Sequence, residues 1–98
     1  MLRALPLALM LAGLAAAPSL ASDSGHYYRA ELSQAAPASQ VIAGSVLWLC
    51  NGTECVADKG TSRPVVMCKR LAEATSAVMR FSYAGEDLAA DDLARCNA

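Results

Sequence analysis

The sequence predicts an α+β domain in which a small antiparallel sheet carries two helices on one face and is stapled by two disulfides. Three observations lead to this prediction. Several segments alternate apolar and polar side chains as strands do, and two segments repeat their apolar residues at helical spacing. Four cysteines in a chain of 98 residues form an even set suited to disulfides. The chain is also too short for a second domain.

The first residues are typical of a secretory signal peptide. Arg3 provides a basic start, and an apolar run of about 14 residues follows, which is shorter than the ~20 residues that cross a bilayer. Pro18 ends this run, and small residues lead up to Ala21. We expect cleavage after Ala21, so that residues 22–98 form one domain that is periplasmic or secreted and has no transmembrane span. An uncleaved N-terminal anchor is the alternative.

The composition of residues 22–98 excludes some classes of partner. Loss of Arg3 leaves 7 basic residues against 9 acidic ones. No basic patch is present that would favour nucleic acid as a partner. A chain of this size buries only about 60% of its surface, and few aromatic residues are available to fill its core. Such a domain usually depends on covalent crosslinks.

The spacing of the cysteines favours one of three possible disulfide pairings. Cys50 and Cys55 flank a turn that contains Asn-Gly, the dipeptide preferred in hairpins, so they should face each other across two strands. Cys68 and Cys96 lie on the apolar stripes of two segments with helical spacing. We therefore expect Cys50–Cys55 and Cys68–Cys96, and the longer loop should stabilise the fold more.

A metal site is the alternative use of the same cysteines. Zinc sites usually combine two short Cys-x2-4-Cys knuckles, or one knuckle with two close histidines. This chain has a single short spacing and one histidine, His26, near the start of the domain. It has no Cys-x-x-Cys redox motif either. We expect no cofactor and no bound metal.

The elements follow in the order strand, strand, strand, helix, strand, helix. We expect strands over residues 26–32, 41–50, 54–58 and 78–83, and helices over residues 64–76 and 90–96. The second strand is expected to bend or bulge at Gly44. Trp48 should lie on the same face as Cys50 and cover the disulfide.

Local signals add detail to the first helix and to the last strand. Thr61 or Ser62 should cap the first helix, with Pro64 in its first turn. In the last strand Met79 and Phe81 alternate with polar residues and should face the core.

Candidate functional residues are few. Arg63 lies at the expected N-terminus of the first helix, where free N–H groups favour anions, and Lys69 and Arg70 follow on the outer face. We predict a ligand or partner surface at these three residues. No nucleophile is paired with a base, so catalysis is not expected.

A set of residues that occur in a fixed order gives the chain a resemblance to a family of proteins. They are Tyr27, Tyr28, Trp48, Cys50, Gly52, Cys55, Ala57, Arg63, Cys68, Leu71, Phe81, Gly85, Leu93, Cys96 and Asn97. In these the chain resembles an uncharacterised family of small exported four-cysteine proteins from alphaproteobacteria. The resemblance implies an exported domain of unknown activity and assigns no catalytic residue.

We therefore expect an exported, non-enzymatic accessory or binding domain of the cell envelope. Its partner would be a protein or another envelope component, and the domain itself would be a monomer. A small periplasmic enzyme or enzyme inhibitor is one alternative. A metal- or redox-responsive module is the other.

Overall fold

A computed structural model describes residues 25–98. The predicted signal peptide and its cleavage site lie outside the described residues. The elements are β1 (Tyr28–Leu32), β2 (Gln40–Ala43), β3 (Val46–Asn51), β4 (Glu54–Ala57), α1 (Pro64–Ala74), β5 (Val78–Tyr83), β6 (Glu86–Asp87) and α2 (Ala90–Cys96). All strands join one sheet in the order β2-β3-β4-β1-β5-β6, and every pairing is antiparallel. The predicted α+β class is confirmed.

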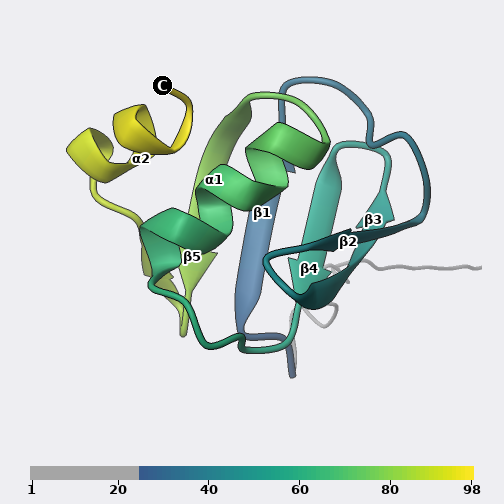
Figure 1. The fold of residues 1–98 in the computed structure, drawn as a ribbon, viewed down its shortest axis with the longest axis horizontal. Coiled ribbons are helices and arrows are strands. Elements are labelled where there is room, and N and C mark those ends of the chain that lie inside the picture. The colour runs from purple at the N-terminus through teal and green to yellow at the C-terminus, as the bar shows by residue number, and fades with distance from the viewer. Residues whose placement is uncertain (1–24) are drawn as a thin grey trace, which may run out of the picture.

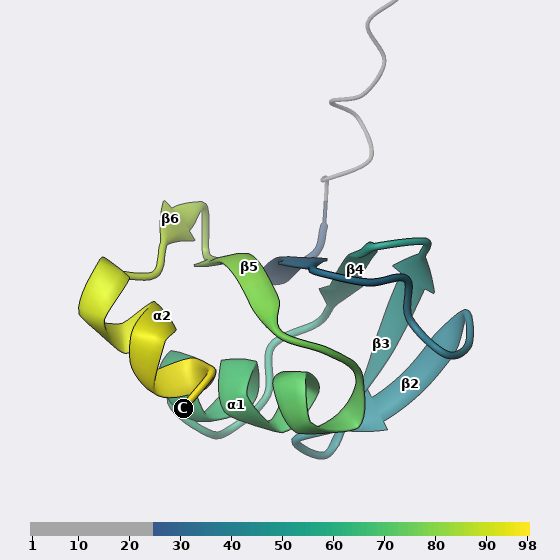
Figure 2. The same cartoon turned by 90° about the horizontal axis from the view of Figure 1, so that it is seen from above.

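The two helices lie in a layer on one side of the sheet (Figures 1 and 2). α1 crosses that side in front of β1 and β5, and α2 packs beside α1 and β5. Figure 2 shows the other side of β1, β4 and β5 without a helix. Within the described part of the chain, no helix has the length and apolar character needed to cross a membrane.

The segment predicted as one strand over residues 41–50 is instead a hairpin. Gly44 and Ser45 both have positive φ, at 62° and 65°, which are the angles of a type I′ turn between twisted strands. Val41 pairs with Trp48, and Ala43 pairs with Val46 across that turn. The glycine that the sequence indicates as a bulge therefore reverses the chain, and the sheet gains an edge strand.

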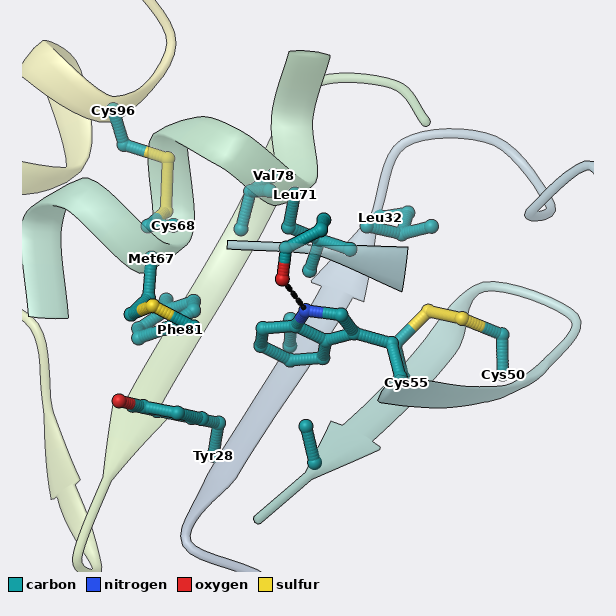
Figure 3. Close-up of a cluster of buried hydrophobic side chains, with 14 residues drawn as sticks. Tyr28, Leu32, Cys50, Cys55, Met67, Cys68, Leu71, Val78, Phe81 and Cys96 are labelled. Atoms are coloured by element: carbon teal, nitrogen blue, oxygen red, sulfur yellow. Dashed lines mark hydrogen bonds between the residues drawn. A yellow bond between two sulfur atoms is a disulfide. The ribbon is translucent and has the colours of Figure 1, made fainter. Parts of the chain in front are cut away.

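The core lies between the sheet and α1, and aromatic rings fill most of it. Tyr28 stacks on Trp48 with ring centroids 5.6 Å apart, and Phe81 packs against both rings. The Trp48 indole N–H donates a hydrogen bond of 3.1 Å to the Ala43 carbonyl (Figure 3). The Tyr28 hydroxyl accepts one of 3.1 Å from the Gly60 N–H. The polar atoms of these buried rings therefore keep partners, as burial requires.

Both predicted disulfides are present and both are buried (Figure 3). Cys50 and Cys55 are directly opposed residues of β3 and β4. Cys68 and Cys96 join α1 to α2 across a sequence separation of 28 residues. Because a helix of seven residues is unstable alone, this second bond fixes α2 to the domain.

Two local predictions are wrong. α1 has Arg63 as its N-cap with no side-chain cap, so neither Thr61 nor Ser62 caps it, although Pro64 does lie in the first turn. Met79 is 57% exposed and does not face the core. The pairing of β1 with β5 shifts register between Glu31 and Leu32, so Met79 is left without an opposite residue and turns outward.

Candidate functional site

The face of the sheet opposite the helices, called the open face below, carries an unusual number of apolar side chains at one end. Ile42 of β2 is 75% exposed, and Leu47 and Leu49 of β3 are 46% and 42% exposed. Ile42 lies opposite Leu47, and Leu49 lies opposite Val56 of β4. These four residues form one contiguous group, the apolar patch. Contiguous exposed apolar side chains of this kind mark interaction surfaces more often than isolated ones do.

Charged side chains cover the neighbouring part of the open face. Arg29 of β1 forms an ion pair of 2.5 Å with Glu54 of β4. Glu31 of β1 lies opposite Arg80 of β5 in the register of the two strands. Ser82 lies opposite Arg29 and continues the row toward β6. The open face is therefore apolar over β2 and β3 and carries charges of both signs over β4, β1 and β5.

Two hollows lie along the open face. One of about 230 Å³ is walled by the charged side chains Arg29, Glu31, Glu54 and Arg80. A smaller one of about 140 Å³ lies beside the apolar patch, against Leu47, Leu49 and His26. Both are shallow and neither encloses a small molecule in the way that catalytic pockets do. A shallow surface with an apolar area beside a charged one resembles a protein interface more closely than an active site.

His26 connects the two parts of the open face. Its side chain borders the smaller hollow and also a third hollow that reaches Arg29 and Ser82. Its Nδ1 atom is buried and has no hydrogen-bond partner among the described residues. A buried ring nitrogen without a partner is unusual, because buried polar atoms normally form hydrogen bonds.

The three residues predicted as a ligand surface do not converge. Arg63 is exposed at the N-terminus of α1. The Lys69 ammonium reaches α2, where it donates to the carbonyls of Arg95 and Ala98 at 3.5 Å and 3.3 Å. Arg70 lies 3.8 Å from Glu73 on α1 itself. Lys69 thus stabilises the C-terminal end of α2, whose carbonyls favour a cation.

The cysteines are not available as metal ligands in this fold. All four are joined in disulfides, so none is a free thiol. Over residues 25–98, no three side chains among His, Cys, Asp and Glu gather closely enough to hold a metal ion. Binding of a metal through cysteine would require a disulfide to open.

The apolar patch was not predicted, although the sequence contains a signal for it. In Val46–Asn51 the buried positions Trp48 and Cys50 alternate with Leu47 and Leu49. A half-buried strand normally carries polar residues at its outer positions. Two leucines there indicate that the outer face is also apolar.

Comparison with known proteins assigns the chain to a family but gives no function for that family. No curated protein and no solved structure matches it. A family model described as a family of unknown function, DUF8200, matches residues 9–98. The resemblance to an uncharacterised family is confirmed at that level. The chain therefore belongs to the family of unknown function DUF8200.

Proposed function

We propose that this protein is an exported binding domain of the cell envelope that recognises another protein through the open face of its sheet. One observation carries the proposal: Ile42, Leu47 and Leu49 are large apolar side chains, are well exposed, and lie together on one face. Exposing them costs solubility, and a binding partner that covers them recovers the free energy of burial.

The charged part of the open face suits the border of such an interface. Arg29 and Glu54 already form a pair, and Glu31 and Arg80 present one charge of each sign. Charges at a border contribute more to orientation and association rate than to affinity. A partner with an apolar area beside complementary charges would fit this arrangement.

Two observations support export to the periplasm or beyond. Residues 1–21 have the composition of a signal peptide. Both disulfides belong to a small domain, and such bonds persist in oxidising compartments. Intact mass spectrometry of protein recovered from the periplasm and the medium checks this part. We expect a chain that begins at Ser22 and carries two disulfides, and a full-length chain in the cytoplasm would contradict it.

The binding function is tested by capture from envelope extracts with matched variants. Immobilised wild-type protein should retain a specific protein, and the double variant Leu47→Asp/Leu49→Asp should lose it. Met79→Asp is the control, because Met79 is at least as exposed as the two leucines but borders a hollow beside α2, away from the apolar patch. Equal capture by all three proteins would overturn the assignment of the open face.

The alternative of a small enzyme or enzyme inhibitor makes a different prediction. An inhibitor would be captured with an enzyme and would reduce its turnover, whereas an accessory domain would leave turnover unchanged. An activity assay on the captured complex separates the two. The open face is the surface that both would use.

A further inference from the structure

The outer edge of β2 has main-chain groups that no strand of the sheet satisfies. The Cys50 N–H donates a hydrogen bond of 2.8 Å to the Ser39 carbonyl, in register with the pairing of β2 and β3. Hydrogen-bonded pairs alternate along an antiparallel ladder, so Val41 and Ala43 also point their main-chain groups at β3. The N–H and C=O groups of Gln40 and Ile42 then point outward, to the edge.

This edge is short, at four residues, but lacks the other features that usually prevent strands from pairing. Natural edge strands are protected by charged residues, prolines or bulges. β2 reads Gln-Val-Ile-Ala, and no charged residue occurs between Glu31 and Glu54. Its pairing with β3 is regular, without a bulge. Ile42 is 75% exposed, and the rest of the described chain makes no backbone hydrogen bond to the outward main-chain groups of Gln40 or Ile42.

The opposite edge of the sheet is closed by the chain itself. β6 consists of Glu86 and Asp87, both acidic and both exposed. Beyond β6, the Leu88 N–H donates to the Phe81 carbonyl at 2.8 Å. The Asn97 side-chain amide then accepts from the Val78 N–H and donates to the Val78 carbonyl, both at 2.8 Å. Among residues 25–98, the β2 edge is therefore the more accessible of the two edges for a further strand.

We propose that two copies of this chain pair along β2 as an antiparallel, two-fold symmetric dimer. The axis passes beside Val41, so that Gln40 of each copy lies opposite Ile42 of the other. Both residues have outward main-chain groups, and each such pair exchanges an N–H···O=C bond in both directions. The contact is isologous, and the acidic, closed β6 edge prevents further addition, so assembly ends at the dimer.

Pairing in this register also joins the two open faces. Ile42 of one copy lies next to Gln40 of the other, and the apolar patches become continuous across the axis. The dimer replaces the monomer expected from the sequence. It does not depend on the partner proposed above, because its contacts are main-chain groups at an edge rather than the face of the sheet.

Sedimentation equilibrium of the mature protein over a wide range of concentration tests the proposal. We expect a reversible monomer–dimer equilibrium and no larger species. Ile42→Pro removes an outward N–H and no bond to β3, which is the position where an edge strand tolerates proline. Symmetry removes that bond twice, so the dissociation constant should rise at least about tenfold. Gln40→Pro, at the first residue of β2, should act in the same way.

Leu47→Asp is the matched control, because it alters the open face and leaves every main-chain group of β2 in place. It should remain dimeric while losing partner capture, which separates the dimer from the proposed function. Amide hydrogen exchange of wild-type protein should show protection at Gln40 and Ile42 that disappears on dilution. A monomer at all concentrations up to millimolar, a larger oligomer, or a dimer unaffected by both proline variants would overturn the proposal.

Discussion

Asn97 connects the end of the chain to the sheet through its side-chain amide. Its Oδ1 accepts a hydrogen bond from the Val78 N–H and its Nδ2 donates to the Val78 carbonyl, both at 2.8 Å. The amide thus takes the place of a neighbouring strand where β6 has ended. Nδ2 also donates to the Leu93 carbonyl of α2 at 3.2 Å, so one side chain links sheet and helix.

Asn97→Ala should reduce the free energy of unfolding by about 1–3 kcal/mol, because it leaves main-chain groups of β5 without partners. Urea unfolding measures the change. Asn97→Asp should reduce the free energy of unfolding by a similar amount. The carboxylate keeps an acceptor for the Val78 N–H but lacks the two N–H donors of the amide. Asn51→Ala is the control: Asn51 is exposed at the end of β3, and this variant should remain within about 0.5 kcal/mol of wild type. Equal stability of Asn97→Ala and Asn51→Ala would contradict the role given to the amide.

Individual side chains show where prediction from sequence fails. Alternation correctly places Phe81 in the core. Met79 follows the same alternation but lies outward, because a register shift depends on how β1 and β5 meet and not on β5 alone. Lys69 has Glu73 at helical spacing but turns to the carbonyls of α2, which are remote in sequence.

The β2–β3 hairpin depends on two residues with positive φ. Gly44 also lies close to α1: a Cβ atom there would approach Met67 Cε to 2.8 Å, and Met67 is fully buried. Ser45 has the same backbone conformation without the freedom of glycine. At Gly44, both the backbone conformation and the contact with Met67 restrict which side chains are tolerated. At Ser45, only the backbone conformation restricts them.

Gly44→Ala should lower the free energy of unfolding by more than about 1 kcal/mol, because it combines an unfavourable φ with a clash in the core. Ser45→Gly should raise stability by several tenths of a kcal/mol, since it relieves the same φ in an exposed position. Thermal unfolding of the two variants beside wild type compares them. A neutral Gly44→Ala would show that the turn does not approach α1 as closely as described.

The two disulfides secure different elements and should contribute unequally. Loss of the Cys50–Cys55 bond should cost about 2 kcal/mol, and loss of Cys68–Cys96 about 3.5 kcal/mol, because the second closes a longer loop in the unfolded chain. We compare Cys50→Ala/Cys55→Ala with Cys68→Ala/Cys96→Ala in urea. Amide exchange should increase throughout α2 only in the second variant, and protection of α2 without its disulfide would contradict this assignment.

At the scale of the whole molecule, the sequence predicts the fold class and both disulfides but not the order of the strands. β1 pairs with β4 and β5 and so lies in the centre of the sheet, although it comes first in the chain. Alternation identifies a strand without identifying its neighbours. The open face depends on that order, because Arg29 and Val56 become adjacent only when β1 joins β4. The arrangement of charges on this face could therefore not be predicted.

Reduction of both disulfides should unfold the domain. Together they contribute about 5–6 kcal/mol, which is comparable with the total stability of a domain of this size. The noncovalent core is small, since it holds little more than Tyr28, Trp48, Phe81 and the aliphatic residues around them.

Circular dichroism with and without reductant measures the loss of folded structure. The variant with all four cysteines changed to alanine separates loss of the crosslinks from other effects of the reductant. We expect both samples to lack a cooperative thermal transition at moderate temperature, so that folding is confined to an oxidising compartment. A reduced protein that still melts cooperatively near the wild-type midpoint would show that the core is sufficient, and it would remove one of the two observations that support export.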